Sequence, residues 1–137
     1  MKILVAEDER VSRRMLQTIL TQWGYEVVAA EDGLRAWQIL TSATPPHLAI
    51  LDWMMPGMDG TRIVEQLRLQ GREPYVYVVL LTSREKREDM LSALEAGVDD
   101  FLTKPFDPAE LKARLRAGKR LVDLQNELIA ARTSGSR

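Results

Sequence analysis

Short apolar runs alternate along the chain with longer segments in which apolar residues recur every three or four positions. The short runs have the length and residue types of β-strands and lie at residues 3–6, 26–30, 48–51, 75–81 and 99–102. The longer segments have the spacing of amphipathic helices and lie at residues 12–23, 33–40, 60–69, 84–96 and 108–132. Strands that alternate with helices predict a parallel sheet covered on both faces. With right-handed crossovers, five such units give an α/β, doubly wound fold in three layers.

The composition narrows the class of protein without identifying it. The chain has 137 residues, enough for one domain, and its 19 basic and 20 acidic side chains leave a net charge of −1. This balance argues against direct, non-specific binding of nucleic acid, and no helix-turn-helix module is present. The absence of cysteine excludes disulfides, thiolate zinc sites and thiol catalysis. Because no apolar run approaches the length of a membrane span and no signal peptide is present, we expect a cytoplasmic protein without membrane contact.

Charged and hydroxyl side chains stand at the carboxyl ends of four predicted strands. Residues 7–9 (Glu-Asp-Glu) follow the first strand, Asp52 follows the third, Thr82 closes the fourth and Lys104 follows the fifth. Ligands of doubly wound sheets bind at this edge, where the strand order reverses. A strand order of 2-1-3-4-5 brings the carboxylates after the first and third strands together, although periodicity alone does not fix this order.

Carboxylates gathered at one edge repel one another unless a cation lies among them. Two carboxylates about 5 Å apart repel by about 3 kcal/mol at an effective dielectric constant near 20. Lys104 offers one positive charge, and Mg²⁺ favours carboxylate, water and phosphate oxygens. The combination indicates phosphoryl transfer to Asp52, with the metal and Lys104 stabilising charge and Thr82 donating its hydroxyl. Taken singly, each of these residues is equally typical of a solvated turn or a helix cap.

Five motifs at these positions are typical of one family. They are Ile3-Leu4-Val5-Ala6-Glu7-Asp8, Leu51-Asp52-Trp53-Met54-Met55-Pro56-Gly57-Met58-Asp59-Gly60, Leu80-Leu81-Thr82-Ser83, Ala96-Gly97-Val98-Asp99-Asp100-Phe101 and Leu102-Thr103-Lys104-Pro105-Phe106. Over nearly all of residues 1–120, the chain resembles the CheY-like receiver domain of two-component response regulators. The resemblance implies a flavodoxin-like fold with strand order 2-1-3-4-5. It also implies a signalling switch that receives a phosphoryl group from a histidine kinase or a phosphotransfer protein.

The resemblance assigns the acceptor and the metal ligands. Asp52 resembles the residue that becomes an aspartyl phosphate, and Asp8 resembles a direct Mg²⁺ ligand. The backbone carbonyl of Met54 is implied as a further ligand, and Glu7 is implied to bind the metal directly or through water. Glu7 stands where many receivers have aspartate, and its longer side chain leaves the mode of this contact open. In the family, the positions of Met54 and Arg84 also tune how fast the phosphoryl group is lost.

The resemblance also assigns the switch. Thr82 and Lys104 resemble the two residues that contact the phosphoryl group. Phe101 resembles the aromatic residue that turns inward when Thr82 moves toward the phosphate, and it replaces a frequent tyrosine, so it offers a partner no hydroxyl. The peptide bond between Lys104 and Pro105 resembles one that is usually cis in the family.

The last predicted helix is longer than a sheet of this size needs. Asp107, Pro108 and Glu110 form a capping-box pattern at its start. From there it runs for about 25 residues, or about 37 Å. Its apolar stripe continues at Leu121, Leu124 and Leu128.

We therefore divide the chain into a receiver domain at residues 1–120 and a helical extension with a loose tail at residues 121–137. This division predicts a helix that pairs with its copy in a homodimer or leads into an output domain, and a solvated helix with a frayed end is the alternative. The linker resembles those of receivers that precede cyclic-di-nucleotide synthases or phosphatases.

Three other functions remain open from the sequence. A receiver-like interaction module that works without phosphorylation has the same fold. A haloacid-dehalogenase-like phosphatase also uses an aspartate nucleophile, but it needs a second aspartate two positions on, where this chain has Met54. A flavodoxin-like flavin binder places its phosphate loop after the first strand, where residues 7–9 repel a phosphate. The complete acidic site favours the signalling switch, which modifies only itself and is not an enzyme with turnover.

Overall fold

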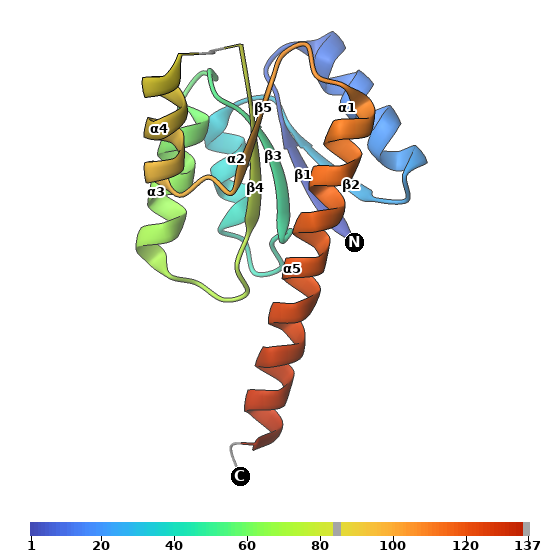
Figure 1. The fold of residues 1–137 in the computed structure, drawn as a ribbon, viewed down its shortest axis with the longest axis vertical. Coiled ribbons are helices and arrows are strands. Elements are labelled where there is room, and N and C mark those ends of the chain that lie inside the picture. Colours follow the sequence, from blue (N-terminus) through green and yellow to red (C-terminus); the bar gives the residue numbers. More distant parts are fainter. Residues whose placement is uncertain (84–85, 136–137) are drawn as a thin grey trace.

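A computed structural model describes residues 1–83 and 86–135, in which five strands alternate with five helices. The strands are β1 (Lys2–Ala6), β2 (Glu26–Ala30), β3 (Leu48–Asp52), β4 (Tyr77–Thr82) and β5 (Asp100–Thr103). The helices are α1 (Arg10–Gln22), α2 (Gly33–Leu40), α3 (Gly60–Gln70), α4 (Arg87–Ala96) and α5 (Pro108–Gly135). Figure 1 shows this alternation from the amino terminus to the long α5.

The five strands form one parallel sheet in the order β2-β1-β3-β4-β5. The predicted α/β, flavodoxin-like fold and its strand order are therefore confirmed. The order reverses between β1 and β3, where Ala6 pairs with Leu51. The turns after these two strands consequently lie side by side at the carboxyl edge of the sheet.

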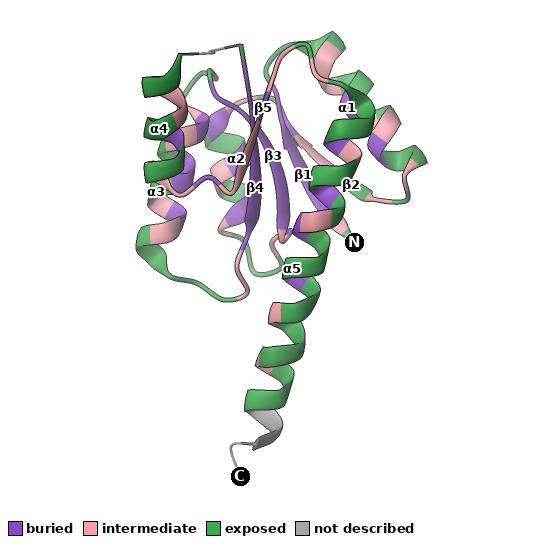
Figure 2. Cartoon of the chain, in the orientation of Figure 1, coloured by how far each residue is buried: buried purple, intermediate pink, exposed green. Residues whose placement is uncertain are grey.

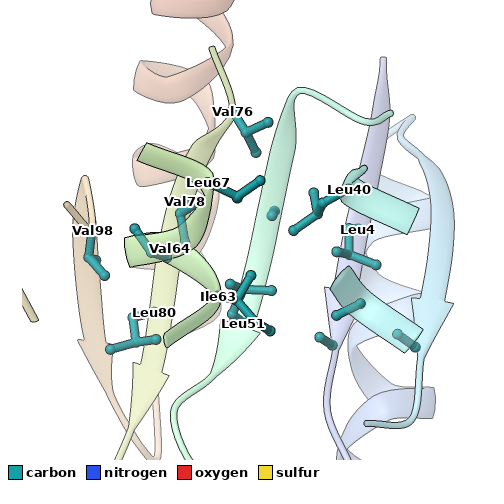
Figure 3. Close-up of a cluster of buried hydrophobic side chains, with 14 of the residues drawn as sticks. Leu4, Leu40, Leu51, Ile63, Val64, Leu67, Val76, Val78, Leu80 and Val98 are labelled. Atoms are coloured by element: carbon teal, nitrogen blue, oxygen red, sulfur yellow. The ribbon is translucent and has the colours of Figure 1, made fainter. Parts of the chain in front are cut away.

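The helices cover the sheet in two layers, with α2, α3 and α4 on one face and α1 and α5 on the other (Figure 1). The central strands β1, β3 and β4 are almost wholly buried and are purple in Figure 2, whereas most residues of β2 and β5 are only partly buried. Figure 3 shows the first core, where Leu4, Leu51 and Leu80 of the strands face side chains of α2 and α3, including Leu40 and Ile63. Burial on both faces explains why the three central strands are continuous apolar runs rather than alternating ones.

β4 begins two residues later than its apolar run predicts. The N–H of Tyr75 donates to Gln125 Oε1 of α5 at 2.6 Å, so this residue bonds to a helix rather than to a neighbouring strand. At its other end, β4 extends to Thr82. The predicted start of the next helix at residue 84 lies outside the described residues, and α4 is described from Arg87.

α5 begins at the predicted residue but is capped in a simpler way. The N–H of Ala109 donates to Asp107 Oδ1 at 2.9 Å, which satisfies one of the free N–H groups of the first turn. The carboxylate of Glu110 pairs with Arg114 at 3.6 Å, so it lies toward the next turn of the helix. The expected start at Pro108 is thus confirmed, with Asp107 as the capping residue.

α5 extends well beyond the rest of the molecule, as Figure 1 shows. Its 28 residues correspond to about 42 Å. Two contacts hold it to the segment before β4: the Gln125 bond to Tyr75, and an ion pair between Arg132 and Glu73 at 2.5 Å. The side chains of its outer apolar stripe are exposed, at Leu121 (55%), Leu124 (56%) and Leu128 (70%). None of the helices described is both long enough and apolar enough to cross a membrane.

Candidate functional site

Three carboxylates meet where β1 and β3 end. Asp52 is the last residue of β3, and Glu7 and Asp8 directly follow β1. One carboxylate oxygen from each of the three lies within 4.8 Å of the other two. The parallel pairing of β1 with β3 produces this convergence, as the strand order predicts.

Lys104 reaches the carboxylates from the turn after β5. Its Nζ lies 3.0 Å from Glu7 Oε1 and 3.1 Å from Asp52 Oδ1. The backbone N–H of Lys104 donates to the carbonyl of Thr82 at 2.8 Å. The peptide bond between Lys104 and Pro105 is cis, as the family resemblance implied. Burial disfavours the charged ammonium, but the hydrogen bonds to Glu7 and Asp52 outweigh it and raise the pKa of Lys104. Lys104 is therefore a permanent cation at neutral pH.

Glu7 is the most buried carboxylate of the site, with 1% of the residue exposed. Burial, and next the adjacent Asp52 carboxylate, raise the pKa of Glu7 to about 7, while Lys104 opposes the shift. Lys104 binds Oε1, but Oε2 is buried and has no hydrogen-bond partner within the described part of the chain. Such an oxygen is costly to bury. Coordination of a cation would satisfy it.

The available ligands fit a hard divalent cation. All three are carboxylates, the type that Mg²⁺ prefers. Three carboxylates beside one lysine leave two negative charges, which one divalent ion neutralises. Met54 lies two residues after Asp52, and its side chain is exposed, which agrees with a contribution from its backbone carbonyl rather than its sulfur. The site therefore has the charge and donor types expected for Mg²⁺.

Glu9 does not belong to this cluster, although it adjoins Asp8 in sequence. Its carboxylate caps α1 by accepting the N–H of Val11 at 3.1 Å and that of Ser12 at 2.7 Å. Hydrogen bonds from Ser12 and then from Val11 lower the pKa of Glu9. The sequence signal of this helix start is Glu9 followed three positions later by Ser12. The signal is masked because Glu9 also belongs to the acidic run at residues 7–9.

The backbone of Asp52 is fixed by a close approach of α3. The N–H of Gly60, the first residue of α3, donates to the carbonyl of Trp53 at 2.8 Å. A Cβ atom at Gly60 would lie 2.6 Å from the carbonyl oxygen of Asp52. Only glycine can therefore occupy this position without displacing the strand end that carries Asp52.

The predicted switch residues lie on β4, which pairs with the strand that carries Asp52, and on β5, the next strand along the sheet. Asp52 pairs with Leu81 of β4, so Thr82 follows at the same edge of the sheet, where it is buried. Phe101 of β5 pairs with Leu80 and packs, partly buried, against the core under α2 and α3. Thr82 and Phe101 thus lie on adjacent, paired strands.

No motif predicts a second polar cluster at the opposite edge of the sheet. Asp99 accepts the hydroxyl of Tyr75, the guanidinium of Arg68 at 3.0 Å and the N–H of Val78 at 2.8 Å. Burial is the main cause that raises the pKa of Asp99 and also that of Tyr75. Arg68 also lies over the Tyr75 ring, 4.1 Å from its centroid. The cluster joins α3, the segment before β4 and the turn before β5.

Comparison with known sequences gives one consistent result. The sequence profile described as "Response regulator receiver domain" matches residues 3–116. The chain is 41% identical over 121 residues to the phosphate regulon transcriptional regulatory protein PhoB of Escherichia coli (strain K12), covering 88% of this chain and 52% of PhoB. It is 43% identical over 122 residues to the probable transcriptional regulator ycf27 of Porphyridium aerugineum, covering 89% of this chain and 49% of that protein. The chain thus spans about half the length of these relatives.

Solved structures agree with the sequence matches. The receiver domain of Francisella response regulator 1452 has a TM-score of 0.80 at 32% identity, covering 88% of this chain and 98% of that one. The chemotaxis protein CheY4 of Vibrio cholerae has a TM-score of 0.76 at 30% identity, covering 85% of this chain and 96% of that one. The family profile, the relatives and the fold all lead to the same conclusion. The chain belongs to the response regulator receiver domain family of two-component systems.

Proposed function

We propose that the chain is a phospho-acceptor switch, in which Asp52 receives a phosphoryl group from a histidine kinase or a phosphotransfer protein. The observation that supports this most is the convergence of Glu7, Asp8 and Asp52 within 4.8 Å, with Lys104 Nζ 3.1 Å from Asp52 Oδ1. A nucleophilic carboxylate beside a fixed cation is the arrangement that phosphoryl transfer requires.

Glu7, Asp8, Asp52 and the backbone carbonyl of Met54 would hold Mg²⁺. When bound, Mg²⁺ neutralises charge on the phosphoryl oxygens and on the carboxylates around them. The buried, unpartnered Oε2 of Glu7 supports this set of ligands. Glu9, which caps α1, is not among them.

An oxygen of the Asp52 carboxylate attacks the phosphorus atom of the donor's phosphohistidine. The new P–O bond gives an aspartyl phosphate as the P–N bond breaks, and its electron pair stays on the imidazole nitrogen. Lys104 stabilises the charge of the transferred group, because its ammonium already lies against Asp52. Thr82, at the end of β4, donates its hydroxyl to a phosphoryl oxygen.

The new contacts shift a conformational equilibrium toward an active state. A change from 1:99 to 99:1 needs about 5.5 kcal/mol of differential interaction, and each hydrogen bond to a charged group supplies about 1.5–3 kcal/mol. Thr82 and Lys104 together can therefore drive most of this shift. Phe101 turns inward as Thr82 moves, and the surface of α4, β5 and α5 changes with it.

Residues 1–120 form the receiver domain in this proposal, and residues 121–137 extend it. The exposed stripe of Leu121, Leu124 and Leu128 on α5 supports a role in transmission, either to an output domain or to a second copy of the chain. The two relatives are described as transcriptional regulators, but the chain covers only about half of each.

Intact-protein mass spectrometry after incubation with acetyl phosphate and Mg²⁺ tests the proposal. The wild-type chain should gain the mass of one phosphoryl group, and Asp52→Asn should gain none. Asp123→Asn, at an exposed position of α5, is the matched control and should behave as the wild type. No mass gain in the folded wild-type chain, or equal gain in Asp52→Asn, would instead favour the interaction module that works without phosphorylation.

A further inference from the structure

A cavity lies at the amino edge of the sheet, opposite the carboxylates. Its volume is about 440 Å³, within the range of small-molecule sites. Its wall includes Lys2 at the start of β1, His47 just before β3 and Val76 just before β4. A five-residue strand separates this edge from Asp52 by roughly 16 Å, so the cavity is distinct from the phosphoryl site.

Two cations line this cavity without a carboxylate partner. Lys2 Nζ donates to the carbonyl of Thr44 at 3.4 Å, and Arg72 Nη2 donates to the carbonyl of Ser42 at 3.3 Å. Within residues 1–83 and 86–135, neither side chain forms an ion pair. The two acceptor residues, Ser42 and Thr44, are two positions apart in the chain, so their Cα atoms are separated by at most about 7 Å. Both charges are therefore anchored on the same short stretch of the cavity wall.

The other charged side chains at the cavity are already engaged. Arg68 pairs with Asp99 at 3.0 Å, and Glu73 pairs with Arg132 of α5 at 2.5 Å. Lys2 and Arg72 consequently leave an uncompensated positive charge on the cavity lining. An anion is the ligand that this charge favours.

The remaining lining is mostly apolar. Leu40 and Leu67 come from the carboxyl ends of α2 and α3, and residues 45–46 and Pro74 add three proline rings. Rings with a fixed backbone form a wall that loses little conformational freedom when a ligand binds. His47, the one histidine of the sequence, is half-buried in the wall and offers a ring nitrogen.

We propose that this cavity binds a small organic anion, a molecule with an apolar body and a carboxylate, sulfonate or phosphate group. The apolar body lies against Leu40, Leu67 and the prolines, and the anionic group lies between Lys2 and Arg72. The same wall segment, residues 72–76, holds α5 through Glu73 and Tyr75. A bound anion therefore acts on the helix that leaves the domain, by a route that does not use Asp52.

The fluorescent probe 8-anilinonaphthalene-1-sulfonate has this combination of apolar body and negative charge. Titrated into the 137-residue chain, it should bind with enhanced fluorescence and shift the amide NMR signals of the non-proline residues at the cavity, at positions 2, 42–44, 47, 72, 73, 75 and 76. The uncharged N-phenyl-1-naphthylamine should bind at least about three-fold more weakly. Equal binding of both probes, or shifts confined to α1, Phe106 or the α5 leucines, would overturn the proposal.

Charge variants at the cavity sharpen the test. Arg72→Gln and Lys2→Gln should each weaken binding of the sulfonate about two- to five-fold, and the double substitution should weaken it more than either change alone. Arg62→Gln, at an exposed position of the same helix as Leu67, is the control and should leave binding unchanged. Raising the salt concentration should weaken binding by the wild type as well. Affinity that is indifferent to both the double substitution and salt would contradict a charge-directed site.

Discussion

Glu7→Gln is expected to stabilise the metal-free protein at neutral pH while removing its stabilisation by Mg²⁺. The folded chain raises the pKa of Glu7 from 4.5 to about 7. The folded state therefore holds this proton more tightly than the unfolded state, and unfolding releases it between about pH 4.5 and 7. Stability consequently falls as the pH rises through this window and is lowest above pH 7.

The magnitude follows from the pKa difference. At about 1.4 kcal/mol for each unit of pKa, the ionised Glu7 lowers the free energy of unfolding by up to about 3 kcal/mol at pH 8. Glutamine keeps the size of the side chain and removes its charge. In EDTA at pH 8, Glu7→Gln should therefore be more stable than the wild type by up to this amount, and the two should converge near pH 4.5.

Urea unfolding followed by tryptophan fluorescence at several pH values, in EDTA and in Mg²⁺, measures both effects. Mg²⁺ should raise the unfolding midpoint of the wild type at pH 8 and affect Glu7→Gln much less. Glu65→Gln, an exposed position on α3, is the control and should follow the wild type. A metal-free Glu7→Gln protein that is less stable than the wild type at pH 8, or that responds equally to Mg²⁺, would refute the reasoning.

Three further variants test other parts of the structure. Thr82→Ala should still accept the phosphoryl group on Asp52 but lose the change in the NMR signals of β5 that follows phosphorylation, and Thr82→Ser should retain it. Gln125→Ala leaves the N–H of Tyr75 without its acceptor and should lower the free energy of unfolding by about 1 kcal/mol in urea, whereas an unchanged midpoint would show that α5 is not held there. Gly118→Ala should destabilise the fold by about 1–3 kcal/mol in thermal unfolding, although alanine favours helices, because its Cβ would overlap the Tyr77 ring. A Gly118→Ala protein more stable than the wild type would show that α5 does not pack closely on β4.

The fold was predictable because its strongest signals are local and repeated. The central strands β1, β3 and β4 are buried on both faces, so each is a nearly uninterrupted apolar run, and the alternation of strands with amphipathic helices has few alternative topologies. The start of β4 was predicted two residues too early because it depends on a contact that is not local. Tyr75 has a β-propensity like that of the residues that follow it, but its N–H donates to Gln125, 50 residues later. A contact between such distant positions leaves no periodic signal.

The candidate site was predictable as a set of strand ends, but not in its details. The positions of Asp52 and Lys104 follow from the strand order. Glu7 is buried beside Lys104, whereas Glu9 caps α1. The sequence does not predict this difference, because it depends on the directions in which the side chains of one turn point. The cavity near Lys2 and Arg72 depends on loops whose residues carry no motif.

The Mg²⁺ dependence of phosphorylation is the most direct test of the central claim, that a divalent cation among the carboxylates prepares Asp52 for transfer. The rate of phosphorylation by acetyl phosphate is measured against Mg²⁺ concentration in the wild type and in Asp8→Asn, and Mg²⁺ affinity is measured separately by calorimetry. The rate of the wild type should saturate with the same midpoint as binding, and Asp8→Asn should need several-fold more Mg²⁺. Phosphorylation at an undiminished rate in EDTA would contradict the claim.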